Sequence, residues 1–332
     1  MIKSCCVLGG SGFIGSALTR RLSKSGSYSF QIIDKNPSLF FSNKTRIADV
    51  RNLSQLEDSI PNNVHIINLA AEHQDDVFPL NLYHDVNVMG AVNVCKVARK
   101  KNVKTIIFTS SVAVYGFADI GTSESGKVAP FNEYGRTKYE AELVYKAWQA
   151  ESPDDRTLVI IRPTVVFGEG NRGNVFNLLK QIASGKFVMV GSGLNRKSMA
   201  YVENVAAFLE FALTFKPGTH VYNYIDKPDS NMNELVNHIN KLLGRSEKIK
   251  IRLPYIFGLI IGILFDVIAR VARKKFPISA IRIKKFCANS VYESAVHETG
   301  FIPPIPLMDA IDRTVKFEFI EDHRSAPLFF SE

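Results

Sequence analysis

Short, fully apolar runs alternate along the first half of the chain with longer stretches in which apolar residues recur at helical spacing. The stretch 16–25 places Leu18 and Leu22 on one helical face, and a second such stretch runs from about 87 to 100. Runs that are apolar on both faces predict buried parallel strands. Their alternation with helices predicts an α/β fold, a Rossmann-type doubly wound parallel sheet. The predicted strands are residues 3–8, 29–33, 64–69, 105–109 and 158–161.

The second half of the chain is expected to form a smaller C-terminal lobe beside this sheet. We place the sheet domain in residues 1–166, with a strand at 220–225 returning to it, and mainly a substrate-binding lobe in 167–332. The composition, 46% hydrophobic and 22% charged, excludes a disordered chain, collagen and a coiled coil. A ligand is then expected in the cleft between the two parts.

A glycine-rich turn, Gly9-Gly-Ser-Gly12-Phe-Ile-Gly15, joins the first predicted strand to the first predicted helix. Glycines at these positions let the backbone turn sharply and approach a pyrophosphate, which then faces the helix N-terminus. Asp34 follows 19 residues after Gly15, at the end of the second strand, where a carboxylate can bind the adenosine ribose 2′-hydroxyl. The combination predicts a dinucleotide site that favours NAD, although Lys35 leaves some room for NADP.

Three polar residues downstream predict acid–base chemistry. Ser111 falls just past the strand 105–109, and Tyr134 and Lys138 lie four residues apart on one face of a predicted helix. A phenol has an ordinary pKa near ~10 and is a poor base at neutral pH. A cation one turn away favours the phenolate, and a nearby hydroxyl can orient a substrate oxygen.

Four motifs together resemble the extended short-chain dehydrogenase/reductase superfamily, and within it the NAD-dependent sugar epimerases and dehydratases. They are Gly9-x-x-Gly12-x-x-Gly15, Thr109-Ser-Ser-Val-Ala-Val-Tyr-Gly116, Tyr134-x-x-x-Lys138 and Arg162-Pro-Thr-Val-Val-Phe-Gly168. The resemblance covers almost the whole chain. It implies NAD as the cofactor and Ser111, Tyr134 and Lys138 as the catalytic residues. It also implies cofactor contacts from Gly9, Gly12, Phe13, Ile14, Gly15, Asp34, Asp49, Val50, Leu69, Ala70, Ala71, Asn87, Tyr134, Lys138 and Thr164.

Five further stretches narrow the resemblance to epimerases of lipid-linked sugars. They are Leu69-Ala-Ala-Glu-His-Gln-Asp-Asp-Val77, Gly168-Glu-Gly-Asn-Arg-Gly-Asn-Val175, Lys197-Ser-Met-Ala-Tyr-Val202, Tyr222-Asn-Tyr-Ile-Asp-Lys-Pro-Asp229 and Lys284-Lys-Phe-Cys-Ala288. They resemble bacterial 4-epimerases that convert N-acetylglucosaminyl-diphospho-undecaprenol to its N-acetylgalactosaminyl epimer during O-antigen, and hence lipopolysaccharide, biosynthesis. The resemblance implies an isomerase that 4-epimerises a diphosphate-linked N-acetylhexosamine through a 4-keto intermediate. Its expected substrate contacts are Ser111, Asn174 and Lys197.

Two positions depart from the superfamily's pattern. Leu8 stands where threonine is frequent, which is a small change to the turn. Lys197-Ser198 stands where nucleotide-sugar epimerases have an Arg-Asp pair whose arginine binds the nucleotide diphosphate. A lysine still offers a point charge to a pyrophosphate but loses the bidentate fork of arginine. The departure disfavours a UDP-sugar substrate and is neutral for a polyprenyl diphosphate.

Three alternative functions remain open from the sequence. The first is an epimerase or dehydratase of a soluble, UDP-linked sugar, which differs only in its substrate. The second is a sterol-type alcohol dehydrogenase, which would consume NAD stoichiometrically. The third is a non-catalytic, NAD-binding regulator, which would have no need of the intact set Ser111, Tyr134 and Lys138.

The net charge of +9 is concentrated in one segment. Eleven Lys and Arg stand against two acidic residues between Arg245 and Lys285, and the remainder of the chain is neutral. The same segment contains the apolar run 253–265, which is shorter than the ~20 residues that span a bilayer. Segment 253–285 is therefore expected to lie in anionic headgroups, with a buried core helix as the alternative. This predicts a cytoplasmic protein that is peripheral on the inner face of the cell membrane.

The remaining features add little chemistry. No signal peptide is expected, because the first residues lead straight into a predicted strand, and the four cysteines are expected to be buried thiols. Its histidines show no metal-ligand spacing, so no metal is expected. The basic residues lack interleaved aromatic platforms, so no nucleic acid is expected. Trp148 is expected in the core or in the interface of a possible homodimer.

Overall fold

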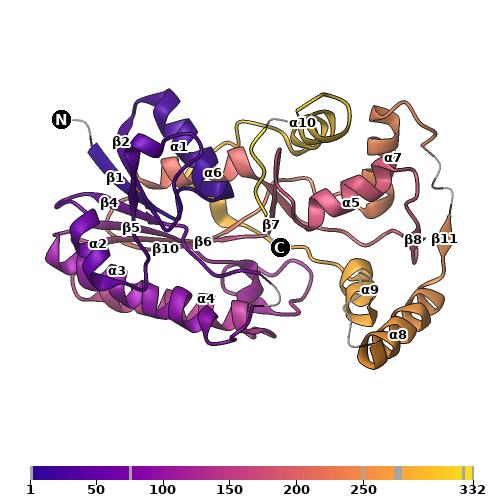
Figure 1. Cartoon of the computed structure of the whole chain (residues 1–332), viewed down its shortest axis with the longest axis horizontal. Helices are drawn as coiled ribbons and strands as arrows, with labels where there is room; N and C mark the ends of the chain where they lie inside the picture. Colours follow the sequence, from indigo (N-terminus) through magenta and orange to yellow (C-terminus); the bar gives the residue numbers. More distant parts are fainter. Residues whose placement is uncertain are drawn as a thin grey trace.

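Seven parallel strands form the central sheet of the computed structural model, in the order β10–β6–β5–β4–β1–β2–β3 (Figure 1). Strand order runs outward from β1 and β4, the arrangement of a doubly wound sheet, so the expected fold class is confirmed. The structure describes residues 3–74, 77–247, 249, 251–272, 279–323 and 326–330. The strands are β1 (Lys3–Leu8), β2 (Tyr28–Asp34), β3 (Thr45–Ile47), β4 (His65–Asn68), β5 (Thr105–Thr109), β6 (Thr157–Pro163) and β10 (Gly218–Tyr224).

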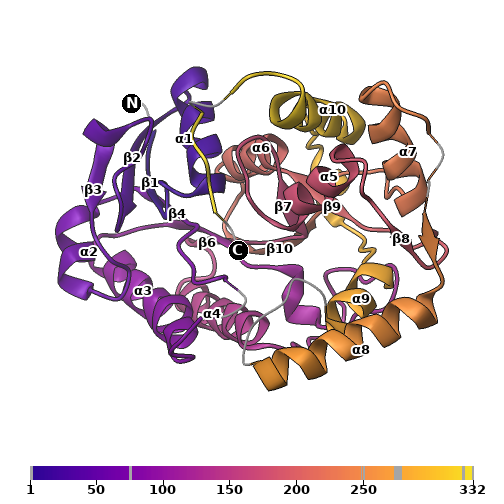
Figure 2. The ribbon, with the colours of Figure 1, turned by 45° about the vertical axis from the view of Figure 1, so that its right-hand side comes forward.

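Helices cover both faces of this sheet. Neighbouring strand residues such as Ile106 and Ile107 are both buried, and they pack into two different cores because successive side chains point to opposite faces. One face carries α1 (Phe13–Ser25) and α6 (Val202–Ala212). The other carries α2 (Leu53–Ser59), α3 (Gly90–Lys100) and α4 (Glu133–Ala150), as Figures 1 and 2 show.

The C-terminal half forms a second group of elements beside the sheet. Its small sheets pair β7 (Val165–Phe167) with β9 (Met199–Tyr201) and β8 (Met189–Val190) with β11 (Arg252–Leu253). Its helices are α5 (Asn174–Ala183), α7 (Met232–Leu242), α8 (Tyr255–Ala272), α9 (Ala280–Cys287) and α10 (Leu307–Phe319). Short 3₁₀ turns occupy Ser42–Lys44, Val112–Tyr115 and Ala295–Thr299.

Strand β10 ties the two halves together. It pairs with β6 in parallel from Gly218 opposite Thr157 to Tyr224 opposite Pro163, at the edge of the central sheet. The strand expected at 220–225 therefore lies in this sheet, although the division into two domains at residue 166 stays a prediction.

One local feature differs from the sequence-based expectations. The helix expected from about residue 87 begins earlier, with a π-helical turn at His84–Met89 that continues into α3. Such a turn inserts an extra residue per turn and is frequent at functional sites. Of the two places expected for Trp148, the core is the observed one, because its side chain is fully buried between α4 and the sheet.

The apolar run at 253–265 forms most of helix α8, which lies at the edge of the molecule beside α9 (Figures 1 and 2). Its large side chains are exposed, as with Ile256 at 68% and Leu264 at 56%, so the buried-core alternative is wrong. Among the described helices, none combines the length and apolarity needed to cross a membrane. The basic residues Arg273, Lys274 and Lys275 of this segment lie outside the described part of the chain.

Candidate active site

The glycine-rich turn after β1 forms a cradle that any side chain would fill. Gly9 adopts a φ of +74°, and a Cβ there would lie 2.6 Å from the backbone nitrogen of Ala70. A Cβ on Gly15 would lie 2.5 Å from the Cα of Gly10, so α1 needs glycine to approach the turn this closely. The first N–H groups of α1 therefore lie at the carboxyl ends of the central strands, where an anion is stabilised.

Asp34 closes one side of this cradle. Its Oδ2 accepts a hydrogen bond from the Ser11 backbone N–H at 3.0 Å, and its Oδ1 accepts one from the Asn36 N–H at 2.9 Å. The carboxylate is thereby fixed at the end of β2, directly beside the turn. Each oxygen keeps lone pairs that can accept hydrogen bonds from a ribose diol.

Other predicted cofactor residues lie around the same edge of the sheet. Asp49 is ion-paired with Arg51 at 2.6 Å, which lowers the pKa of its carboxyl group. The Asn87 side chain, in the π-helical turn, bonds the backbone of Glu72 and the Thr137 hydroxyl, and so holds the loop after β4 in place. Gly12 caps α1, Val50 and Thr164 are buried, and Ile14, Leu69, Ala70 and Ala71 are half-buried.

This edge fits a dinucleotide. The cradle is open only because Gly9 and Gly15 lack side chains, and a fixed carboxylate stands where the adenosine ribose would meet it. Within the described chain, the buried hydroxyl of Thr109 at the end of β5 has no hydrogen-bond partner, so it remains able to bond a ligand.

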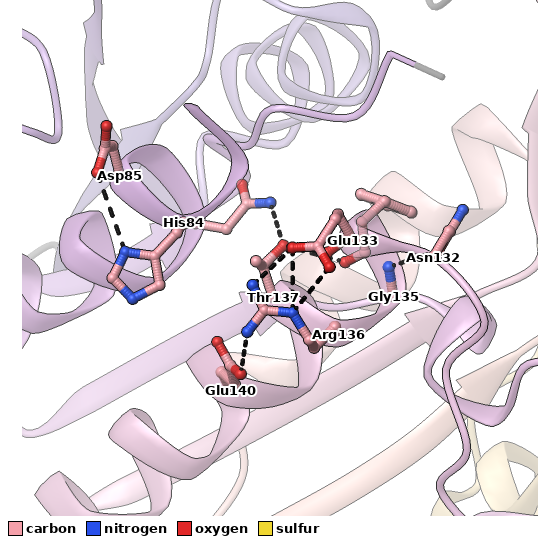
Figure 3. A network of polar contacts seen from close by, with 10 residues as sticks. His84, Asp85, Asn132, Glu133, Gly135, Arg136, Thr137 and Glu140 are labelled. Atoms are coloured by element: carbon pink, nitrogen blue, oxygen red, sulfur yellow. Dashed lines mark hydrogen bonds and ion pairs between the residues drawn. The ribbon is translucent and has the colours of Figure 1, made fainter. Parts of the chain in front are cut away.

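The start of α4 positions the two catalytic candidates on that helix. Asn132 caps the helix by accepting a hydrogen bond from the Gly135 N–H at 2.9 Å (Figure 3). Arg136 lies between Glu133 and Glu140 on the outer side of the same turns, as Figure 3 shows. These contacts fix the first two turns, which carry Tyr134 and Lys138.

A close approach of two backbones brings Ser111 to Tyr134. A Cβ on Gly135 would lie 2.4 Å from the carbonyl oxygen of Ala113, so the helix can rest on the 3₁₀ turn after Ser111 only with glycine there. The Ser111 side chain, whose hydroxyl accepts a hydrogen bond from the Ala113 N–H at 3.1 Å, thereby comes close enough to the Tyr134 phenol to influence its pKa. Burial raises the pKa of the Tyr134 phenol, and the Ser111 side chain opposes that rise.

Lys138 lies one helical turn further into the protein and is buried. Its Nζ is 4.4 Å from the centroid of the Phe108 ring. Burial lowers the pKa of the Lys138 ammonium to about 7, and the nearby Glu142 carboxylate opposes this change. The structure thus brings Ser111, Tyr134 and Lys138 together, and the role of each stays a prediction.

A buried polar network behind Lys138 was missed by sequence reasoning. Glu142 on α4 forms an ion pair of 2.6 Å with Arg162 on β6, and also accepts a hydrogen bond from the Ser110 hydroxyl at 2.6 Å. Arg162 also donates to the Tyr115 hydroxyl at 2.7 Å, which in turn donates to Asn223 on β10. The spacing of four residues from Lys138 to Glu142 is the only local signal of this network.

The predicted substrate residues lie in the C-terminal half. Lys197 is half-buried, and its Nζ donates to the backbone carbonyl of Lys285 on α9 at 2.7 Å. Burial lowers the pKa of Lys197 to about 8. Ser198 is buried and donates to Asp229 at 2.6 Å, whereas Asn174 is exposed at the first turn of α5. No group of three potential metal-ligating residues occurs among the residues that the structure describes.

The last described residues return to the cofactor cradle, which the sequence pattern did not indicate. Phe329 exchanges backbone hydrogen bonds with Gly170 at 2.9 Å and Arg172 at 2.8 Å. Its ring lies 5.6 Å from the ring of Phe13, which stands at the start of α1. Segment 326–330 therefore packs over the helix end that faces the expected pyrophosphate.

The chain belongs to the NAD dependent epimerase/dehydratase family, whose model matches residues 5–224. This match spans the glycine cradle, the Ser111, Tyr134 and Lys138 set, and the chain from Cys5 in β1 to the end of β10. The protein is accordingly an enzyme of a family that uses NAD as its cofactor.

Individual relatives refine this assignment. The chain is 44% identical, over the full length of both chains, to the N-acetyl-alpha-D-glucosaminyl-diphospho-ditrans,octacis-undecaprenol 4-epimerase of Escherichia coli O157:H7. It is 28% identical to a UDP-glucose 4-epimerase of Vibrio cholerae, over 72% of this chain and 75% of the relative. Among solved structures it is similar to the UDP-glucuronic acid 4-epimerase of Bacillus cereus in complex with NAD, with a TM-score of 0.70 at 19% identity over 95% and 98% of the two chains. That structural likeness concerns the fold.

Proposed function

We propose that this chain is an NAD-dependent 4-epimerase that converts N-acetylglucosaminyl-diphospho-undecaprenol to its N-acetylgalactosaminyl epimer. The observation that carries the proposal is the 44% identity to an epimerase of that name, which extends over both whole chains. The side chains needed for such chemistry are present and adjacent, because Ser111 lies beside Tyr134, which is one helical turn from Lys138. The proposal includes a role in O-antigen assembly.

The half-buried Tyr134 performs the proton transfer through its phenol. As phenolate, it takes the proton of the sugar 4-hydroxyl, while Ser111 donates a hydrogen bond to the same oxygen. Lys138 favours the phenolate by its charge and holds the nicotinamide ribose. NAD, which the glycine cradle and Asp34 would hold, would supply reversible hydride transfer at the sugar C4, and this chemistry inverts that carbon without net oxidation.

The diphosphate side of the site supports a lipid carrier. Lys197 offers one ammonium where nucleotide-sugar epimerases have a bidentate arginine, and Ser198 is engaged by Asp229. A polyprenyl diphosphate makes no demand for that arginine. Its tail, however, stays in a bilayer, so the enzyme must bring its cleft to the membrane surface.

Helix α8 supports such docking because it packs on its glycines and exposes its large side chains. A Cβ on Gly258 would lie 2.5 Å from Val190, and one on Gly262 would lie 2.8 Å from the Ala280 backbone. The exposed residues form what we term the docking face: Ile256, Phe257, Ile260, Ile263, Leu264 and Val267. Burying such a side chain in lipid contributes roughly 1.5–3 kcal/mol.

Cations beside the docking face would add attraction to anionic lipid. Arg270 near the end of α8 and Arg282, Lys284 and Lys285 on α9 are all exposed. Asp266, the one acid of α8, accepts a hydrogen bond from the Ala280 N–H at 3.0 Å and so links the two helices. Each basic residue near the surface contributes about 1 kcal/mol of binding. The proposal is therefore of a peripheral membrane enzyme.

The experiment that tests the proposed function compares two substrates. The purified protein is incubated with N-acetylglucosaminyl-diphospho-undecaprenol or with UDP-N-acetylglucosamine, and the sugar released by mild acid is identified by chromatography. Conversion of the lipid-linked sugar without accumulation of NADH is expected. Conversion of the UDP-sugar alone, or stoichiometric reduction of NAD, would contradict the proposal.

A further inference from the structure

Two phenylalanine rings stand exposed beside the catalytic helix, apart from the docking face. Phe117 and Phe131 stack with their ring centroids 4.7 Å apart, yet they remain 69% and 46% exposed. Phe117 follows the 3₁₀ turn after Ser111, and Phe131 immediately precedes the Asn132 cap of α4. Both rings therefore belong to the two segments that carry the catalytic residues.

Lys285 of α9 completes this cluster from the other half of the molecule. Its Nζ lies 5.0 Å from the centroid of the Phe131 ring, while its backbone carbonyl accepts the hydrogen bond from Lys197. Glu133, the acidic residue nearest to Phe131 in the sequence, forms an ion pair of 2.6 Å with Arg136 (Figure 3). An exposed ammonium thus lies against the aromatic pair, and its own backbone contacts the lysine expected at the substrate diphosphate.

This combination has the chemistry of a site for an amphiphile. Aromatic faces bind apolar chains, and a lysine ammonium binds a phosphate as a point charge. A ligand that joins an apolar chain directly to a diphosphate would satisfy both groups at once. Exposed apolar patches of this kind mark binding surfaces when polar groups adjoin them.

We propose that Phe117, Phe131 and Lys285 form a subsite for the lipid end of the substrate. The two rings contact the first isoprene units, and the Lys285 ammonium contacts the phosphate to which they are attached. The subsite rests on the proposed function, since it presumes a polyprenyl-linked substrate. It lies between the catalytic turn and α9, so it guides the lipid from the cleft toward the docking face.

The test separates the lipid from the rest of the substrate. kcat/KM is measured with the undecaprenyl diphosphate ester of N-acetylglucosamine in detergent micelles, with the corresponding methyl diphosphate ester, and with UDP-N-acetylglucosamine. The variants are the double substitution Phe117→Ala/Phe131→Ala and the single substitution Lys285→Met. The matched control is Ile302→Ala, which removes a side chain that is 83% exposed in the loop before α10.

In the double variant we expect kcat/KM for the undecaprenyl ester to fall about tenfold or more, with the methyl ester changed less than about twofold. Lys285→Met should lower kcat/KM for both diphosphate esters, and Ile302→Ala should change neither. In the double variant, equal losses on all three substrates, or none, would overturn the subsite. A parallel loss of binding to anionic vesicles in the double variant would also overturn it, because the rings would then belong to the docking surface. Failure of the wild-type enzyme to convert any lipid-linked substrate would instead refute the proposed function.

Discussion

Tyr134 transfers the proton in the proposed reaction, and its surroundings shift the pKa of its phenol in both directions. Burial raises the pKa of the phenol, whereas Ser111 lowers it. In the proposed mechanism the charge of Lys138 also favours the phenolate. We expect Tyr134→Phe to lower epimerisation by at least about 10²–10⁴-fold, because general-base catalysis contributes that much. NAD affinity, measured by calorimetry, should persist. Near-normal turnover in this variant would remove Tyr134 from the mechanism.

Asp34 is expected to decide between the two nicotinamide cofactors. Its carboxylate, fixed by the Ser11 and Asn36 N–H groups, would repel a ribose 2′-phosphate. The wild type should bind NAD more tightly than NADP, and Asp34→Ser should narrow the difference. Equal wild-type affinities in calorimetry would mean that Asp34 does not face the ribose or that Lys35 compensates.

Lys138 is predicted to make the cofactor-free protein less stable at low pH. Burial lowers its pKa from 10.5 to about 7. The free-energy cost of burying the charged ammonium is therefore absent above pH 10.5, grows as the pH falls, and is complete below pH 7. Lys138→Met should therefore raise the free energy of unfolding by roughly 3–5 kcal/mol near pH 6, and by less at pH 9, while abolishing activity. Urea unfolding at both pH values measures this. A gain that does not change with pH would show that the lysine is not desolvated.

At the scale of elements, the ion pair between Glu142 and Arg162 fastens α4 to strand β6 of the central sheet. Glu142→Gln leaves a buried guanidinium unpaired, so we expect a loss of about 3–5 kcal/mol in the free energy of unfolding. Glu140→Gln is the matched control, because Glu140 lies two residues away and pairs with Arg136 at the surface. That exposed pair should contribute only about 0.2–1 kcal/mol. Similar losses in both variants would mean that the inner pair is solvated.

The elements that sequence predicted best are those specified by local patterns. The strand 105–109 was predicted with its observed bounds from its short apolar run. All five of its residues are buried, as expected for a strand covered on both faces. The glycine cradle and Asp34 were predicted because their spacing follows directly from strand, turn and helix. The exposure of α8 could not be predicted from its sequence, because a helix that is apolar on all sides has the same pattern in a core and at a surface. In the structure, the side of α8 that carries Gly258 and Gly262 is the side that packs against the protein.

Contacts between distant segments explain what the sequence did not predict. Glu142 and Arg162 meet only because β6 lies beneath α4, and Lys197 meets Lys285 only because α9 folds back on the lobe. The need for glycine at position 135 arises from a carbonyl in another segment, that of Ala113. Hydrophobic periodicity does not predict such pairs, because it describes each helix or strand alone.

At the scale of the whole molecule, the docking face should determine where the enzyme works. We expect polar replacement of Ile256, Phe257, Ile260 and Leu264 to release the protein from anionic vesicles and to abolish activity on the lipid-linked sugar. Folding and NAD binding should survive, because these side chains are already exposed. Vesicle sedimentation at low salt measures the first effect. A variant that unfolds, or a wild type that never sediments with vesicles, would contradict membrane docking.

The contact between Phe13 and Phe329 joins parts of the chain that a ribosome makes far apart in time. At roughly 5–20 residues per second, the interval between these two residues lasts about 15–60 s. During that interval β1, the glycine turn and α1 are already synthesised, but the ring that packs on Phe13 does not yet exist. The N-terminal segment around Phe13 is therefore synthesised first, but it is among the last to complete its packing contacts.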